Sequence, residues 1–355
     1  MIFQRHIAHA ITPIGGFPSD ATGGESVRIP IVMELETGDP DDILALLFIL
    51  EHPRAQLKAI VMSPGSPDQI GLIKHLLRKY HHPDIPVGAF NLDHPKPTVS
   101  GWHYTTFGDF ESSRDAVDGA TLILAHCTPD TTMLCCGPMR NLGKAIQVAD
   151  ATHRDLTLGK VVIQGGFVGK NIVLDSVALE KFKDKELFPS WNLDAAQKDT
   201  VRVLTSPRCA DIRMVSKNVC HGVTWDARLS EQITDQGTAM LHTIDRIMTD
   251  YRARKGSPKI IHDLVAATCA LTPPVCDWAR VTMRHQRKAG WGADLSETSN
   301  TFIVTSFNPD NFIQTLCERP FRRQIDHPFS GRGSCPATNA MTISLAKRSF
   351  LGVKE

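Results

Sequence analysis

The sequence predicts an α/β fold in a single domain, with a mostly parallel Rossmann-like sheet flanked by helices. From residue 29 onward, short apolar runs typical of buried strands alternate with helical patterns. No internal repeat and no linker interrupts this alternation. The 355 residues are also enough to bury one large hydrophobic core.

The first helix has the clearest predicted boundaries, because Asp39 can cap it, Pro40 suits its first position and Pro53 ends it. Further helices are predicted at residues 67–80, 139–149, 194–205, 228–253, 262–271 and 309–318. Strands are predicted at residues 29–35, 56–62, 85–90, 131–136, 160–166, 212–216, 279–285 and 301–306. Residues 91–118 are polar and irregular, which indicates a long functional loop.

Two segments flank this alternating region. Residues 1–27 contain the stretch GGFPSDATGG and predict a flexible N-terminal arm. Residues 28–320 form the predicted domain. Residues 321–355 are weakly patterned and form a predicted C-terminal extension.

The charge balance argues against two classes of partner. The chain has 39 Lys and Arg residues and 38 Asp and Glu residues, so its net charge is close to zero. It has no basic block, and its apolar runs are far shorter than the ~20 residues that a membrane span needs. We therefore expect neither nucleic acid nor a membrane as a partner.

The cysteines and the N-terminus predict a cytoplasmic location. None of the nine cysteines forms a C-x-x-C pair, and Cys135, Cys136 and Cys269 stand in apolar surroundings. Buried free thiols in a reducing compartment explain this pattern. A cysteine nucleophile is the alternative, although no neighbouring motif supports it. The N-terminus has no continuous apolar segment, so we predict no secretory signal.

Negative charge is concentrated just after the first predicted strand. The stretch ELETGDPDDILALL contains five carboxylates, those of Glu34, Glu36, Asp39, Asp41 and Asp42. Like charges this close repel one another, so a positive partner is needed. Because Glu34 and Glu36 share one face of the strand, we expect both glutamates to meet the aspartates at one junction.

Two interpretations account for these carboxylates. Asp39 and Asp42 can cap the helix and complement its dipole, but this leaves Glu34 and Glu36 unexplained. A hard cation explains the whole cluster, and Ca²⁺ takes roughly six to eight oxygen ligands. Mg²⁺ is the alternative cation, although the chain has no glycine-rich phosphate loop of the Walker type. The segments CCGPMRN and QGGFVGKN also follow strands, so they should reach the same crevice.

This junction resembles the opening motif of the nucleoside hydrolases, D-x-D-x-G-x-D-D-x-x-A-L. It stands here as ELETGDPDDILAL, with one inserted residue and with Glu34 and Glu36 in place of the first two aspartates. Later segments resemble family motifs in the same order, namely AIVMSPGSPDQIGLIKHLLRKYHHPDIPVGAF, MLCCGPMRNLGKAI, VVIQGGFVGKN, SWNLDAAQKDTVRVLTS and HDLVAATCAL. The resemblance covers about residues 29–320.

The resemblance implies a calcium site and a catalytic base. The implied metal ligands are Glu36, Asp42, Asp263 and the backbone carbonyl of Cys136, and the implied base is Asp41. His262 stands where some members have a histidine that protonates the departing base. The residues alone favour an ordinary helix N-terminus capped by His262 or Asp263, and the resemblance reverses this interpretation.

The resemblance also implies contacts to the substrate. Asn192 and Asn171 match two asparagines that bind the sugar, with Lys170 as the alternative to Asn171. Trp191 either stacks on a ring or fills the core. Ser190 stands at a position near the sugar where the family has a glutamate.

Departures from the family pattern affect these implications. Glu36 is one methylene longer than the usual aspartate, and the inserted residue makes Asp39 an alternative ligand. Ser190 replaces a glutamate, and Ser66 replaces an asparagine. Each lost hydrogen bond to the sugar would cost about 1–3 kcal/mol. We therefore expect common ribonucleosides to bind poorly.

The sequence thus predicts a calcium-dependent hydrolase that cleaves the N-glycosidic bond of a nucleoside or a related N-riboside, nicotinamide riboside included. A hydrolase-like ligand-binding protein with weak or no activity is the first alternative. A metal-dependent phosphohydrolase is the second, and only Arg140 and Lys170 would be near to bind its phosphate. Family habit predicts a homodimer or a homotetramer.

Overall fold

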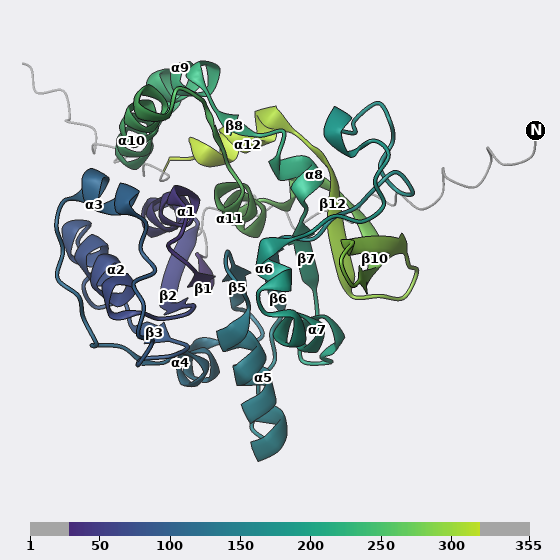
Figure 1. Ribbon diagram of the computed structural model, residues 1–355, viewed down its shortest axis with the longest axis horizontal. Helices are drawn as coiled ribbons and strands as arrows, with labels where there is room; N and C mark the ends of the chain where they lie inside the picture. The colour runs from purple at the N-terminus through teal and green to yellow at the C-terminus, as the bar shows by residue number, and fades with distance from the viewer. Residues whose placement is uncertain (1–27, 320–355) are drawn as a thin grey trace, which may run out of the picture. The chain divides into compact units, whose positions relative to one another are not determined.

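One large sheet runs through the protein, with helices packed against it (Figure 1). The computed structural model describes residues 28–319. The predicted N-terminal arm and C-terminal extension lie outside the described residues.

The large sheet has ten strands in the described residues, in the order β11-β10-β12-β7-β6-β5-β1-β2-β3-β4. These strands are β1 (Ile29–Leu35), β2 (Ala55–Met62), β3 (Val87–Ala89), β4 (Val117–Asp118), β5 (Thr132–Cys135), β6 (Lys160–Gln164), β7 (Ile212–Val215), β10 (Cys276–Gln286), β11 (Gly290–Leu295) and β12 (Thr301–Phe307). Among the ten described strands of this sheet, β10 points opposite to the others and pairs antiparallel with both β11 and β12. A separate antiparallel pair joins β8 (Thr224–Trp225) to β9 (Lys259–Ile260). The predicted fold class is confirmed.

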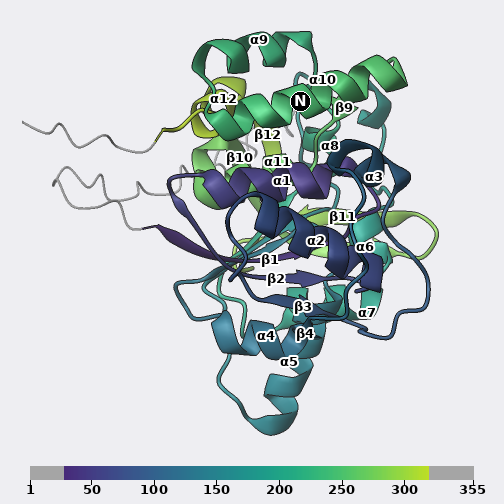
Figure 2. The same cartoon turned by 90° about the vertical axis from the view of Figure 1, so that its left-hand side faces the viewer.

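Helices cover both faces of the sheet (Figure 2). They are α1 (Pro40–Glu51), α2 (Pro67–Lys79), α3 (Gly101–Phe107), α4 (Gly119–His126), α5 (Arg140–Thr152), α6 (Trp191–Asp194), α7 (Gln197–Thr205), α8 (Lys217–Cys220), α9 (Ala227–Gln236), α10 (Ala239–Lys255), α11 (Asp263–Leu271) and α12 (Pro309–Leu316), with short 3₁₀ turns at Glu180–Phe182 and Pro273–Val275. In the described residues no helix is both long and apolar enough to cross a membrane.

The central strand β1 supplies side chains to two cores. Ile31, Met33 and Leu35 pack with α1, α2, α10 and α11 on one face. Val32 packs with α4, α5 and α7 on the other. Both faces of β1 are therefore buried, which explains its continuous apolar sequence.

The structure differs from the predicted elements at several places. The loop at residues 91–118 contains α3 and β4, and it leads into α4, none of which the sequence pattern predicts. The helix predicted at 228–253 is two helices, α9 and α10, because Gly237 ends the first and Thr238 caps the second. The helix predicted at 194–205 begins later, at Gln197, after the short helix α6. The strand β11 is also unpredicted.

Candidate active site

The first turn of α1 places aspartates at the carboxyl end of β1. Asp39 caps the helix, since its Oδ1 accepts a hydrogen bond from the backbone N–H of Asp41 at 3.0 Å. Asp42 is buried, and its Oδ1 accepts a hydrogen bond from the N–H of Glu36 at 2.9 Å. Side-chain capping of α1 is therefore the role of Asp39 alone, which corrects the prediction that Asp42 shares it.

Asp41 connects α1 to the start of α11. Its Oδ2 accepts hydrogen bonds from the backbone N–H groups of His262 at 2.5 Å and of Asp263 at 2.7 Å. His262 occupies the cap position of α11, but its side chain makes no capping bond. The alternative in which His262 caps this helix is therefore wrong, because Asp41 satisfies the exposed N–H groups instead.

The buried carboxylates raise one another's pKa values. Burial, and next the charge of Glu36, raises the pKa of Asp42 well above its ordinary value. Burial and the charge of Asp42 do the same for Asp263. Burial raises the pKa of Asp41 to about 6, and the nearby cation of Lys259 limits this rise. Unpaired negative charge at this depth is therefore costly.

Lys259 is the protein's own positive partner for this cluster, and sequence reasoning missed it. The side chain is buried, and its Nζ lies 2.9 Å from Oδ1 of Asp39. Burial lowers the pKa of Lys259, but Asp41 and Asp39 outweigh this effect and hold it above the ordinary value. Only its position just before His262 and Asp263 in the sequence could have pointed to it.

Glu34 does not join the other carboxylates, which corrects the prediction that both glutamates meet the aspartates. Its Oε1 accepts hydrogen bonds from the backbone N–H and the side-chain amide of Asn141, at 2.8 and 2.9 Å. Its Oε2 accepts a bond from the N–H of Leu142 at 3.2 Å. Glu34 therefore satisfies the first turn of α5, and burial raises its pKa to about 8.

The carboxylate oxygens around Asp41 are suitable ligands for a hard divalent cation. Oδ1 of Asp41 and Oδ1 of Asp263 are buried and lack a hydrogen-bond partner within residues 28–319. Carboxylate oxygens in this condition are the ligands that Ca²⁺ or Mg²⁺ prefers. As the side chains stand, however, no three His, Cys, Asp or Glu residues of the described range converge as a ready metal site. The two unpartnered carboxylate oxygens nevertheless have the chemistry that a hard cation requires.

The backbone carbonyl of Cys136 and the side-chain amide of Asn192 are joined by a hydrogen bond. Asn192 is buried, and its Nδ2 donates to the Cys136 carbonyl at 2.8 Å and to the Gln164 side chain at 2.8 Å. A carbonyl oxygen has two lone pairs, so this bond leaves one for a further contact. Burial raises the pKa of the Cys136 thiol well above its ordinary value, which does not suit a nucleophile.

Two histidines lie near Asp41. Nδ1 of His262 is 3.9 Å from Oδ2 of Asp41, and its ring lies 5.2 Å from that of His221. The Nε2 atoms of both rings are buried and lack partners in the part of the chain that the structure describes. Burial, with the charge of Lys259, lowers the pKa of His262 to about 3, so its imidazole is neutral near pH 7. His221 is a neighbour that the sequence does not indicate.

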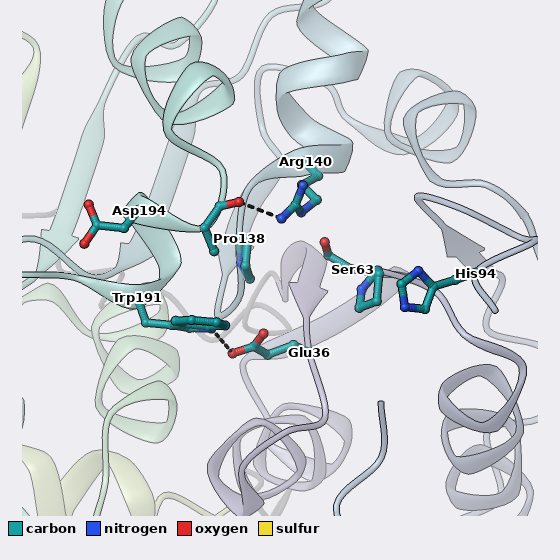
Figure 3. A pocket seen from close by; sticks show the side chains of 9 residues that line it. Glu36, Ser63, His94, Pro138, Arg140, Trp191 and Asp194 are labelled. Atoms are coloured by element: carbon teal, nitrogen blue, oxygen red, sulfur yellow. Dashed lines mark hydrogen bonds between the residues drawn. The ribbon is translucent and has the colours of Figure 1, made fainter. Parts of the chain in front are cut away.

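A pocket of about 490 Å³ opens beside Glu36 (Figure 3). Trp191 and Arg140 line it, together with Ser63, Pro64, His94, Pro138, Asp194 and Ala195. The Trp191 indole Nε1 donates to Oε1 of Glu36 at 2.9 Å. Trp191 is 64% exposed, so the alternative in which it fills the core is wrong.

The remaining predicted substrate residues make internal hydrogen bonds. Ser190 is buried, and its Oγ accepts a bond from the Gly166 N–H at 3.0 Å. Ser66 is also buried, and its hydroxyl shares a bond of 2.5 Å with that of Thr98. The Asn171 side chain donates to the Ala293 carbonyl of β11 at 2.8 Å. The structure thus brings together Glu36, Asp41, Asp42, Asp263, His262, Cys136, Asn192 and Trp191, and it ties Asn171 to β11.

Fold and site together define an α/β protein with an acidic crevice at the carboxyl ends of its parallel strands. The family model of the inosine-uridine preferring nucleoside hydrolases matches residues 31–314. The chain therefore belongs to this family, as the sequence motifs predict. Membership supports hydrolysis of N-glycosidic bonds in N-ribosides and implies a divalent metal cofactor in general.

Individual proteins match this chain over most of its length. An uncharacterized protein of Aquifex aeolicus is 26% identical over 285 residues, which cover 77% of this chain and 93% of that protein. The match to the solved structure of a plant nucleoside hydrolase spans 81% of this chain and 97% of the plant chain, with 17% identity and a TM-score of 0.60. The match to the purine-preferring ribonucleoside hydrolase of Gardnerella vaginalis spans 81% of this chain and 98% of that chain, with 16% identity and a TM-score of 0.56. At such identities the two solved structures establish the shared fold alone.

Proposed function

We propose that this protein is a calcium-dependent hydrolase that cleaves the N-glycosidic bond of a nucleoside or a related N-riboside. The observation that carries the proposal is the buried Asp41, which is fixed by two backbone bonds through Oδ2 while its Oδ1 has no partner in the described residues. A carboxylate held in this way keeps one oxygen ready to accept a proton.

Asp41 acts as the general base in this proposal. A pKa raised by burial to about 6 keeps the group ionised at neutral pH, yet makes it a stronger base than an exposed aspartate. Its proton would come from the water that attacks the sugar. The surrounding carboxylates would stabilise the positive charge that develops on the sugar ring.

His262 would assist the departure of the nucleobase, and other side chains would hold the substrate. Before substrate binds, the imidazole is neutral, so Nε2 would first form a hydrogen bond to the leaving group. Trp191 offers an exposed ring face on which a base or a sugar could stack. Asn192 would contact the sugar through the amide oxygen that its Nδ2 bonds leave unused. The side chains of Asn171 and Ser190 already bond to the backbone, so each would have to give up that bond to contact the sugar.

Glu36, Asp42, Asp263 and the Cys136 carbonyl would hold the calcium ion, with Asp39 as the alternative to Glu36. When bound, the ion supplies positive charge that lowers the pKa of a water molecule and offsets the carboxylates. The carboxylate of Asp39 already pairs with Lys259, whereas within residues 28–319 the carboxylate of Glu36 accepts a hydrogen bond only from the Trp191 indole, at Oε1. This difference favours Glu36 as the ligand.

The substrate is proposed to be larger than a common ribonucleoside, or modified. The hydroxyls of Ser190 and Ser66 are both engaged inside the protein, so neither reaches a sugar in place of the longer family residues. Missing sugar contacts would raise the KM of inosine and uridine. We further propose a cytoplasmic homodimer or homotetramer, on the basis of the cysteine pattern and family habit.

The second candidate function is a ligand-binding protein that has lost catalysis. The engaged Ser190 and Ser66 favour it, whereas the arrangement around Asp41 argues against it. A test is to measure release of free base from inosine, uridine and nicotinamide riboside, with calcium and with a chelator. Base release that the chelator abolishes supports the hydrolase. Binding without release from any N-riboside supports the second candidate, and release of phosphate from a phosphomonoester would instead indicate a phosphohydrolase.

A further inference from the structure

One side of the pocket beside Glu36 carries Arg140, a cation that forms no ion pair with the described residues. Arg140 begins α5 and lines the pocket, and its Nη2 donates to the Ala195 carbonyl at 2.6 Å. This bond uses one of the five N–H donors of the guanidinium. Within residues 28–319, no carboxylate lies at ion-pair distance, 4.0 Å or less, from Arg140.

The two carboxylates that line the same pocket are engaged elsewhere. Glu36 accepts the indole N–H of Trp191. Asp194 accepts hydrogen bonds from Nε1 of Trp291 at 2.7 Å and from the N–H of Ser190 at 2.9 Å. Figure 3 shows the carboxylate of Asp194 directed away from Arg140. At longer range the charge of Arg140 offsets part of the rise in the pKa values of Glu36 and Asp199, and its guanidinium lies 5.9 Å from the centroid of the Phe90 ring. Among the described residues no carboxylate accepts a hydrogen bond from this guanidinium, so its remaining N–H donors are available to a ligand.

Ser63 provides a second, independent observation. It follows β2, lines the pocket and is only 1% exposed, and its Oγ has no hydrogen-bond partner within the described range. A buried hydroxyl without a partner is unfavourable, so this position is suited to a ligand that accepts its hydrogen bond. In Figure 3 Ser63 lies between Arg140 and His94 on the side of the pocket opposite Trp191.

We propose that the substrate of this site is an N-glycoside that carries an anionic group, a phosphate or a carboxylate, and that Arg140 and Ser63 bind this group. The inference rests on the proposed hydrolysis of N-glycosides and names the substrate class. A planar guanidinium is suited to either anion, because both offer paired oxygens. The pocket volume of about 490 Å³ lies in the usual range for a ligand of nucleotide size.

The test compares three probes that differ only in charged groups. Uridine is neutral, uridine 5′-monophosphate adds a phosphate to the sugar, and orotidine adds a carboxylate to the base. For the wild type, kcat/KM of at least one anionic probe should exceed that of uridine by about tenfold or more. A preference for the monophosphate alone assigns a phosphate, and a preference for orotidine alone assigns a carboxylate.

Variants of Arg140 connect this preference to the pocket. Arg140→Gln should lower the ratio of anionic to neutral kcat/KM by about tenfold or more, whereas Arg140→Lys should keep part of the ratio because it keeps the charge. Lys198→Gln, a matched change on the exposed surface of α7, should leave the ratio unaltered. Melting temperatures would show whether each variant is folded.

Calorimetry on the Asp41→Asn variant separates this inference from the proposed function. Dissociation constants of the same probes report the preference without turnover. If no probe releases base but an anionic probe still binds more tightly through Arg140, the proposed function fails and the binding inference stands. Equal binding of all three probes, or a preference that survives in Arg140→Gln, would overturn the inference.

Discussion

Asp41 and Asp263 are joined by a hydrogen bond of 2.7 Å, from the backbone N–H of Asp263 to Oδ2 of Asp41. The bond crosses 222 positions of sequence and fixes the start of α11 against the first turn of α1. One oxygen of each side chain stays buried and without a partner among residues 28–319. The catalytic and metal-binding predictions below depend on this relationship.

The first prediction concerns the base. Asp41→Asn keeps the size of the side chain and an oxygen that can accept the N–H bonds at α11, but it removes the proton acceptor. The turnover rate should fall by at least ~10²-fold while the melting temperature changes little. Steady-state rates with the best N-riboside would measure this effect. Near-normal turnover would assign the base to another carboxylate, Asp39 first.

The second prediction concerns the metal. A calcium-soaked crystal should show one ion in contact with Asp42 and Asp263, at oxygen distances of about 2.3–2.6 Å. Because binding to the folded state stabilises it, adding calcium should raise the melting temperature, and Asp263→Ala should abolish the rise. An empty crevice in the soaked crystal, together with a melting temperature indifferent to calcium, would end this assignment.

The third prediction concerns the internal cation. Lys259→Met removes the positive charge next to Asp39 and Asp41 and should lower the free energy of unfolding by about 1–3 kcal/mol. Calcium should recover part of the loss, since it offsets the same carboxylates. Urea denaturation with and without calcium would measure both effects. Lys255→Met, at the exposed end of α10, is the control and should change stability little.

The fourth prediction concerns acid stability. His52 is buried just after α1, where Nδ1 accepts the Arg54 N–H and Nε2 bonds to the Thr315 carbonyl. Burial lowers its pKa from 6.5 to about 4, so the folded protein favours the neutral ring. The stability from this group is therefore complete above pH 6.5 and is lost as the pH falls toward 4.

The measurement for His52 is the free energy of unfolding between pH 7 and pH 4. The wild type should lose about 1–3 kcal/mol through this group across that range. His52→Gln should be less stable at pH 7 but lose less on acidification. The exposed His242→Gln is the control and should follow the wild-type curve. Parallel curves for His52→Gln and the wild type would show that His52 does not titrate in this way.

Much of the architecture follows from local patterns in the sequence. β1 has the predicted bounds, and α1 begins where Asp39 and Pro40 predict, because a short apolar run and a helix cap are both set by neighbouring residues. Elements with weak local signals were missed. They include α3 within the polar loop and β11, in which glycines interrupt the apolar pattern.

The sequence by itself determined the family, the fold class and the concentration of carboxylates after β1. Only the tertiary structure decided what each carboxylate does. In the folded chain Glu34 accepts hydrogen bonds at the start of α5, Asp41 accepts them at the start of α11, and Lys259 forms an ion pair with Asp39. It also placed Arg140 beside the pocket without an ion pair to any described residue. The physical reason is that charge pairing and helix capping act over a few ångströms in space, between residues that lie far apart in the chain.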